Sequence, residues 1–218
     1  MKREDNYRHK GLRKQLVETL KKKGIKDTNV LEAIGNLPRH YFLAQGFDYQ
    51  AYEDKALPIK CDQTISQPYT VAYMTQLLEI KKHDKVLELG TGSGYQAAIL
   101  ALVGATVYTV ERQESLYHEA RTLLLKLGFN GIKFFYRDGT KGLPEFAPYD
   151  KVIVTAACPE IPDILLDQLK VGGMLIAPIG VKTQQMIKIV KTSETEFKKT
   201  GLEDFKFVPF LEGVEKIK

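Results

Sequence analysis

The sequence has 218 residues, of which 44% are hydrophobic and 27% charged, and its formal net charge is +5. These values are ordinary for one globular domain. No apolar run is long enough to span a membrane, and the charged N-terminus contains no apolar signal core. Cys61 and Cys158 lack a histidine cluster with ligand spacing, so we expect free thiols, no metal site and a cytoplasmic location.

Ten basic residues lie between positions 2 and 26, beginning with Lys2 and Arg3. This concentration is compatible with a nucleic-acid footprint. Apolar residues such as Leu12 and Leu16, however, recur at helical spacing opposite the charges. We therefore favour the solvated face of an amphipathic helix over 8–23, and we expect no nucleic-acid partner.

The remaining elements follow in chain order. Asp27 or Thr28 can cap a second helix that runs to Ile34, residues 42–60 are irregular, and Pro68 can open a helix to Leu78. From Lys85 onward, strands alternate with helices, which predicts a parallel sheet covered on both faces. We expect strands near 85–89, 106–110, 132–136, 150–155 and 173–178, helices near 95–104, 113–127 and 161–169, and antiparallel strands near 186–190 and 205–208.

Residues 86–94 read VLELGTGSG, an apolar strand followed by glycines at alternate positions. Such a strand, glycine turn and helix let the backbone approach a ligand. The spacing differs from that of dinucleotide-binding turns, and no Lys-[Ser/Thr] pair follows to make a phosphate loop. Glu88 precedes the glycines and suits a ligand that carries positive charge. The stretch resembles motif I of the class I methyltransferases, whose cofactor S-adenosylmethionine has a sulfonium and an amino group.

A second acid, Glu111, closes the next expected strand, 21 positions after Gly90. A carboxylate at about this distance grips the ribose hydroxyls in nucleoside sites of the βαβ type. The alternative is a surface acid at the end of a strand. The glycine turn at this spacing favours the ribose role.

Residues 63–69 read QTISQPY, a short polar stretch ahead of an expected helix. Its side chains and the free N–H groups of the helix N-terminus suit an anion such as a carboxylate. On physical grounds alone, Ser66 is more often a simple helix cap.

The resemblance becomes specific when several segments are taken together. Their order and spacing resemble those of the protein-L-isoaspartate O-methyltransferase family, over most of residues 56–180. QTISQPY with TAACPEIP is highly specific, whereas motif I alone is shared by many methyltransferases. The segments are QTISQPYTVAYMT, VLELGTGSGYQAA, YDKVIVTAACPEIP, VGGMLIAPIG and, at 207–214, FVPFLEGV.

The resemblance implies a doubly wound, mostly parallel, seven-stranded Rossmann-like sheet with helices on both faces. Residues 81–218 would form the cofactor-binding core, and residues 1–80 a helical extension that carries the substrate loop. The implied enzyme is monomeric and transfers a methyl group from S-adenosylmethionine to the free α-carboxylate of L-isoaspartyl residues, leaving S-adenosyl-L-homocysteine. The ester then collapses to a succinimide, which starts the repair of damaged proteins and peptides.

The resemblance also assigns residues. Ser66 is the expected catalytic serine, which orients the substrate carboxylate without becoming a covalent nucleophile. The substrate is expected to contact this serine and its neighbours, namely Gln63, Thr64, Ile65, Thr155, Ala156 and Ala157. The cofactor is expected to contact Glu88, Gly90, Thr91, Gly92, Gly94, Glu111, Arg112, Asp138 and Gly139, with the Asp138-Gly139 pair facing the adenine amino group.

Two positions depart from the family pattern. Ile59-Lys60-Cys61-Asp62 replaces a glycine-rich approach to the substrate loop, and Cys158 stands where proline is common. Three other functions remain open: a nucleic-acid methyltransferase, a small-molecule methyltransferase, and a non-catalytic S-adenosylmethionine-binding adaptor. TAAC does not match the motif of amino-methylating enzymes, and Cys158 precedes Pro159, the reverse of the order found in cytosine-C5 enzymes.

Overall fold

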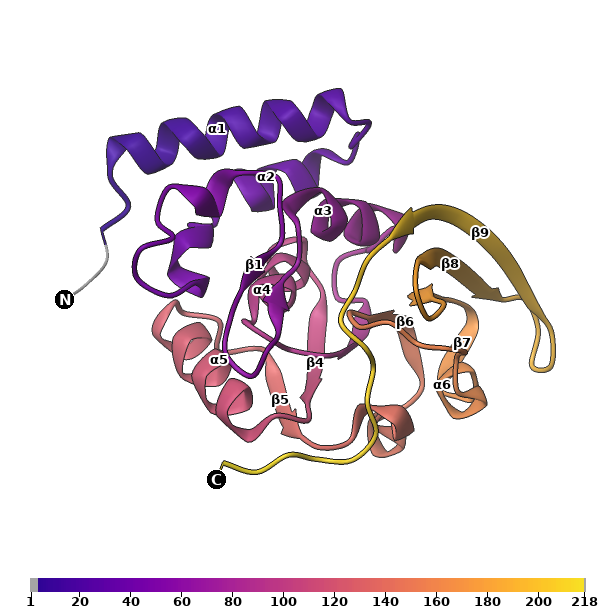
Figure 1. The fold of residues 1–218 in the computed structure, drawn as a ribbon. Helices are drawn as coiled ribbons and strands as arrows, with labels where there is room; N and C mark the ends of the chain where they lie inside the picture. Colours follow the sequence, from indigo (N-terminus) through magenta and orange to yellow (C-terminus); the bar gives the residue numbers. More distant parts are fainter. Residues whose placement is uncertain (1–3, 218) are drawn as a thin grey trace.

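A computed structural model describes residues 4–217; Lys2 and Arg3 of the basic stretch lie outside this range. Its centre is one seven-stranded sheet in the order β5-β4-β3-β6-β7-β8-β9 (Figure 1). Strands β3 to β7 are mutually parallel, and β8 and β9 add an antiparallel edge. The strands are β3 (Lys85–Leu89), β4 (Thr106–Glu111), β5 (Lys133–Tyr136), β6 (Tyr149–Val154), β7 (Leu169–Ile179), β8 (Gln184–Lys191) and β9 (Phe197–Phe205).

The central strands of the sheet are buried on both faces, and successive side chains of a strand point to opposite sides. In β3, Val86 joins one hydrophobic cluster, whereas Leu87 and Leu89 join the other. The first cluster contains residues of five helices, and the second contains Leu165 of the short helix on the opposite face. The helices are α1 (Tyr7–Lys22), α2 (Thr28–Asn36), α3 (Pro68–Leu77), α4 (Tyr95–Leu102), α5 (Glu114–Lys126) and α6 (Asp163–Asp167).

Caps define where the N-terminal helices begin. Asn6 and His9 form a reciprocal capping box at the start of α1, and the Asp27 carboxylate accepts hydrogen bonds at the start of α2. Pro68 occupies the first turn of α3, where its missing N–H is not needed. Between α2 and α3 the chain forms two 3-10 turns, Arg39–Phe42 and Gln50–Tyr52, and a small hairpin of β1 (Leu57–Pro58) and β2 (Thr64–Ile65).

Three expectations from the sequence are wrong in detail. The last strand lies at β9 and not at 205–208, because both faces of this edge strand are largely exposed and show no apolar alternation. The chain leaves the sheet after Phe205, so most of the segment 205–208 lies beyond the strand. Helix α6 is shorter than 161–169, since β7 already begins at Leu169. Arg13 is not on a solvated helix face: it is 6% exposed and ion-paired with Asp5.

After β9, residues 207–217 return across the carboxyl ends of the parallel strands, where they form the yellow segment that runs toward the C-terminus in Figure 1. Backbone hydrogen bonds join Ala157 to Val208 and Phe210, and Glu114 to Glu215. We call residues 207–217 the C-terminal strap. Within residues 4–217, no helix has both the length and the apolar character needed to cross a membrane.

Candidate active site

The glycine loop after β3 has a backbone that other residues do not readily adopt. Gly90 and Gly94 have φ angles of +101° and +85°, in the left-handed region that favours glycine. A Cβ on Gly90 would lie 2.4 Å from the Thr155 hydroxyl oxygen, and one on Gly94 would lie 2.8 Å from a methyl group of Leu124. The Thr155 hydroxyl holds the loop by donating to the carbonyls of Leu89 and Gly90.

A cavity lies at the carboxyl ends of the parallel strands, as expected for a doubly wound sheet. It encloses about 860 Å³, a volume that includes the open solvent at its mouth. It brings together most of the residues that the sequence singles out: Gln63, Thr64, Ile65, Ser66, Gly90, Thr91, Gly92, Glu111, Arg112, Gly139, Thr155 and Ala156. Four others, Glu88, Gly94, Asp138 and Ala157, do not line it.

A second cavity adjoins the first one and encloses about 1150 Å³, a volume that also includes open solvent. It lies between α3 and the segment from Glu203 to Val208. Thr64, Ser66 and Thr155 line both cavities. These three residues therefore lie where a ligand in one cavity would meet a ligand in the other.

Glu111 at the end of β4 is 5% exposed, and its carboxylate is hydrogen-bonded to the glycine loop. One carboxylate oxygen accepts the Gly92 N–H at 2.8 Å, and the other accepts the Gln113 N–H at 2.9 Å. Burial raises the pKa of Glu111, and these hydrogen bonds partly offset the effect. The acid is thus fixed at the cavity wall with its orientation set.

Glu88 differs from its expected place. It is fully buried beneath the glycine loop, accepts a hydrogen bond from the Thr109 hydroxyl, and has one oxygen without a partner among residues 4–217. Thr109 in turn lies 2.6 Å, oxygen to oxygen, from the hydroxyl of Thr91, which does line the cavity. Burial, with a smaller contribution from Glu111, raises the pKa of Glu88 to about 8.

We expect Glu88→Gln to stabilise the unbound protein increasingly as the pH rises. The folded state keeps the proton of Glu88 up to a pKa of about 8, whereas the unfolded state loses it near 4.5. Stability is therefore lost as the pH rises through this window, and a neutral glutamine does not suffer this loss. Urea unfolding of both proteins at about pH 5 and pH 9 measures the difference.

Glu79→Gln is the matched control, because a hydrogen bond from Lys188 lowers the pKa of this exposed acid. This control should show a small effect of the opposite sign. Parallel stability profiles for Glu88→Gln and the parent protein would contradict the assignment of a raised pKa.

Asp138 and Arg112 hold the C-terminal strap. Asp138 accepts the Gly213 N–H at 2.8 Å, and Arg112 donates to the Gly213 carbonyl at 3.0 Å and to the Glu215 carboxylate at 3.2 Å. Although burial opposes ionisation, hydrogen bonds from Gly213 and Thr140 lower the pKa of Asp138. The strap itself lines the first cavity with residues 208–211. The sequence pattern gives these residues no such role, although FVPFLEGV belongs to the resemblance.

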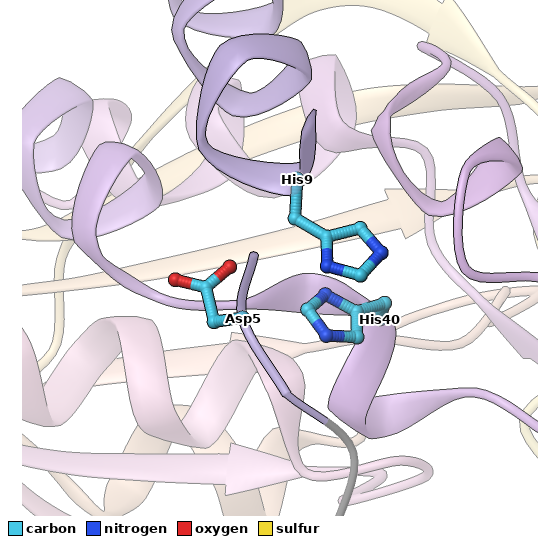
Figure 2. Close-up of side chains that lie close together, drawn as sticks. All are labelled: Asp5, His9 and His40. Carbon is cyan, nitrogen blue, oxygen red and sulfur yellow. The ribbon is translucent and has the colours of Figure 1, made fainter. Parts of the chain in front are cut away.

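Asp5, His9 and His40 form a cluster of potential metal ligands outside the cavity (Figure 2). Arg13 already binds both oxygens of Asp5, at 3.0 and 2.9 Å. The two imidazole rings stack with centroids 4.0 Å apart and planes 25° apart, so their in-plane lone pairs do not converge on one ion. The cluster instead joins α1 to the first 3-10 turn through the stacked rings of His9 and His40. Thirty-one positions separate the two histidines, so no ligand spacing appears in the sequence.

The sheet order, the antiparallel edge and the glycine loop paired with an acid on the next strand define a class I S-adenosylmethionine-dependent methyltransferase. The chain belongs to the protein-L-isoaspartate(D-aspartate) O-methyltransferase family, whose sequence model matches residues 11–215.

Curated relatives and solved structures agree with this membership. Proteins named protein-L-isoaspartate O-methyltransferase from Christiangramia forsetii and Flavobacterium psychrophilum are 57% and 55% identical, over 95% of this chain and 98% of theirs. A solved structure with the same name is 31% identical with a TM-score of 0.83; it covers 90% of this chain, which spans 65% of that longer chain. A putative member from Plasmodium falciparum, in complex with S-adenosyl-L-homocysteine, is 25% identical with a TM-score of 0.79, over 91% of this chain and 98% of that one.

Proposed function

We propose that this protein transfers a methyl group from S-adenosylmethionine to the free α-carboxylate of L-isoaspartyl residues in damaged proteins and peptides. The observation that carries the proposal is the junction of two cavities at Thr64, Ser66 and Thr155. One cavity accepts a nucleoside and the other accepts an extended peptide. The methyl ester formed there collapses to a succinimide, and this starts repair.

The first cavity fits the cofactor. Gly90 and Gly92 line it with bare backbone, and the buried Glu111 carboxylate is directed by two backbone amides. In our proposal Glu111 holds the ribose hydroxyls, and the amides of the glycine loop and Gly139 line the remainder. When bound, S-adenosylmethionine supplies a methyl group that its sulfonium has already activated. S-adenosyl-L-homocysteine is the product.

The residues of this chain would align the substrate carboxylate with the methyl group of the cofactor. A substrate carboxylate is already ionised at neutral pH, so no general base is needed. The Ser66 hydroxyl donates a hydrogen bond that orients this carboxylate. Gln63, Thr64 and Ile65 lie along the peptide. Correct alignment is worth up to about 7–11 kcal/mol of the barrier. Ala157 contributes indirectly, because its backbone N–H and carbonyl hold the strap that shields the cavity from water.

Cys158 argues against the rival cytosine-C5 reaction. The residue is buried at 1% exposure, and burial raises the pKa of its thiol to about 12. The thiolate that would attack cytosine is therefore scarce at neutral pH. Cys158→Ser should keep isoaspartyl methylation.

Two synthetic peptides that differ only in one L-isoaspartyl or one L-aspartyl linkage test the proposal. Each is incubated with the protein and S-adenosylmethionine, and mass spectrometry detects a methyl ester that base removes. We expect ester on the isoaspartyl peptide alone. Ester on neither peptide, with cofactor binding intact by calorimetry, would reject the proposal and turn attention to RNA, a small molecule or the adaptor role.

We also propose roles for the two parts of the chain, together with its oligomeric state, location and partners. Residues 1–80 shape the substrate side and residues 81–218 hold the cofactor, as one compact unit that acts as a cytoplasmic monomer without a nucleic-acid or membrane partner. One hydrophobic cluster shared by α1, α3 and β3 supports the single unit. Light scattering tests the monomer, and salt-dependent retention on RNA would contradict the absence of a nucleic-acid partner.

A further inference from the structure

Arg39 is a fully buried arginine in the first 3-10 turn, and it contacts the backbone of the substrate loop. One terminal nitrogen, Nη2, donates to the Ser66 carbonyl oxygen at 2.8 Å. The contact joins residues 27 positions apart. It therefore fixes the main chain of the serine whose hydroxyl we place on the substrate.

The charge of Arg39 is only partly compensated, because Tyr95, Asp54 and Tyr52 favour the charged form less than burial opposes it. Among residues 4–217, its Nε and Nη1 atoms have no hydrogen-bond partner, and no carboxylate forms an ion pair with it. Burial lowers the pKa of Arg39 to about 10, which still leaves the group charged at neutral pH. Burying such a cation is unfavourable, and packing alone does not explain it, because an apolar side chain would fill the space more favourably.

The same guanidinium lies against the cofactor side of the site. Its central carbon is 4.9 Å from the centroid of the Tyr95 ring, a distance typical of a cation–π contact. Tyr95 is the first residue of α4, directly after Gly94, and it lines the first cavity. Arg39 thus contacts both the substrate loop and the helix that follows the glycine loop.

Other contacts hold the loop farther along the chain. Asp54 accepts the Tyr69 N–H at 2.7 Å and the Gln67 side-chain amide at 3.1 Å. Lys23 balances its charge at 2.6 Å. These bonds restrain the start of α3, whereas the hydrogen bond from Arg39 restrains the backbone of Ser66.

We propose that Arg39 is a positioning residue for methyl transfer: its planar guanidinium holds the Ser66 carbonyl while it rests on Tyr95, and so directs the Ser66 hydroxyl toward the junction of the two cavities. This rests on the proposed function. Lysine cannot reproduce the arrangement fully, because a compact ammonium lacks the flat face and the fork of donors.

Arg39→Met, Arg39→Gln and Arg39→Lys test the proposal, with Arg13→Met as the matched control. Arg13 is also a buried arginine of the N-terminal region, but its hydrogen bonds go to Asp5, Gly35 and Tyr52 and not to the substrate loop. Each protein is measured below its own melting temperature. The readouts are kcat and KM for the isoaspartyl peptide, cofactor Kd by calorimetry, and amide hydrogen exchange in residues 63–69.

For Arg39→Met we expect kcat/KM to fall at least about tenfold below that of Arg13→Met, with cofactor Kd changed less than about threefold. Amide hydrogen exchange in residues 63–69 should accelerate in Arg39→Met and not in the control Arg13→Met. Arg39→Lys, which retains one donor, should recover part of the activity, and Arg39→Gln replaces Arg39→Met if the latter does not fold.

Equal kcat/KM for the Arg39 and Arg13 variants, or unchanged exchange in 63–69, would overturn the role of Arg39 while the proposed function stands. A parent protein that methylates no isoaspartyl peptide would instead overturn the function. In that case hydrogen exchange still decides whether Arg39 fixes the loop.

Discussion

Ser66→Ala is expected to lose about 10²-fold or more in kcat for the isoaspartyl peptide and to keep its cofactor affinity. Ser66 lines both cavities, and in our proposal the loss of its hydroxyl disturbs the orientation of the substrate carboxylate. The backbone contact with Arg39 uses the Ser66 carbonyl and remains in the variant. Steady-state kinetics on the peptide and calorimetry with the cofactor separate the two effects.

Ser93→Ala is the control for losing any hydroxyl from the same cavity wall. Its oxygen accepts the Tyr95 N–H at 3.3 Å, so it serves the glycine loop. We expect this variant to change cofactor affinity more than kcat. If Ser66→Ala methylated the peptide at the parent rate, Ser66 would have no catalytic role.

Glu111→Ala is expected to weaken cofactor binding by about 10²-fold or more, because hydrogen bonds to a charged group contribute roughly 1.5–3 kcal/mol each. The change also removes the acceptor of the Gly92 and Gln113 amides, so the glycine loop loses its support. Calorimetric titration with S-adenosylmethionine measures the loss, and Glu111→Gln shows how much of it depends on charge.

The parent protein should bind the cofactor more weakly as the pH falls, because the ionised Glu111 is the better acceptor. Burial raises the pKa of Glu111, so the weakening should begin at a higher pH than for an exposed glutamate. Glu119→Gln, which removes an exposed acid paired with Lys60, should leave affinity unchanged. If Glu111→Ala bound S-adenosylmethionine as tightly as the parent protein does, the proposal that Glu111 holds the ribose hydroxyls would be wrong.

The parallel part of the fold could be predicted from the sequence because its strands are buried on both faces. Such strands are continuous apolar runs, and those of β3, β4 and β6 stand out between helices of regular period. The glycine loop could also be predicted from the sequence. Positive φ angles and close packing both require glycine at Gly90 and Gly94, so the structural need is visible as residue type.

Other features depend on contacts that no local pattern reports. Glu88 is in the motif but faces Thr109 inside the fold, and Asp138 binds the strap, because a residue's place in a motif does not define which atoms it meets. Cys61 and Asp62 adopt φ angles of +57° and +53° in the turn between β1 and β2. Nothing in the sequence shows that two residues other than glycine take this strained conformation.

The exposed edge of the sheet has a consequence for a protein whose proposed substrates are damaged chains. A chain that has lost its fold can pair its backbone with an open sheet edge. In β9 this edge carries Lys198 and Lys199 and further along Glu203 and Asp204, largely in solvent. Charges on an edge strand disfavour pairing with another strand. These charges therefore lower the tendency of this edge to act as a template for an unfolded chain.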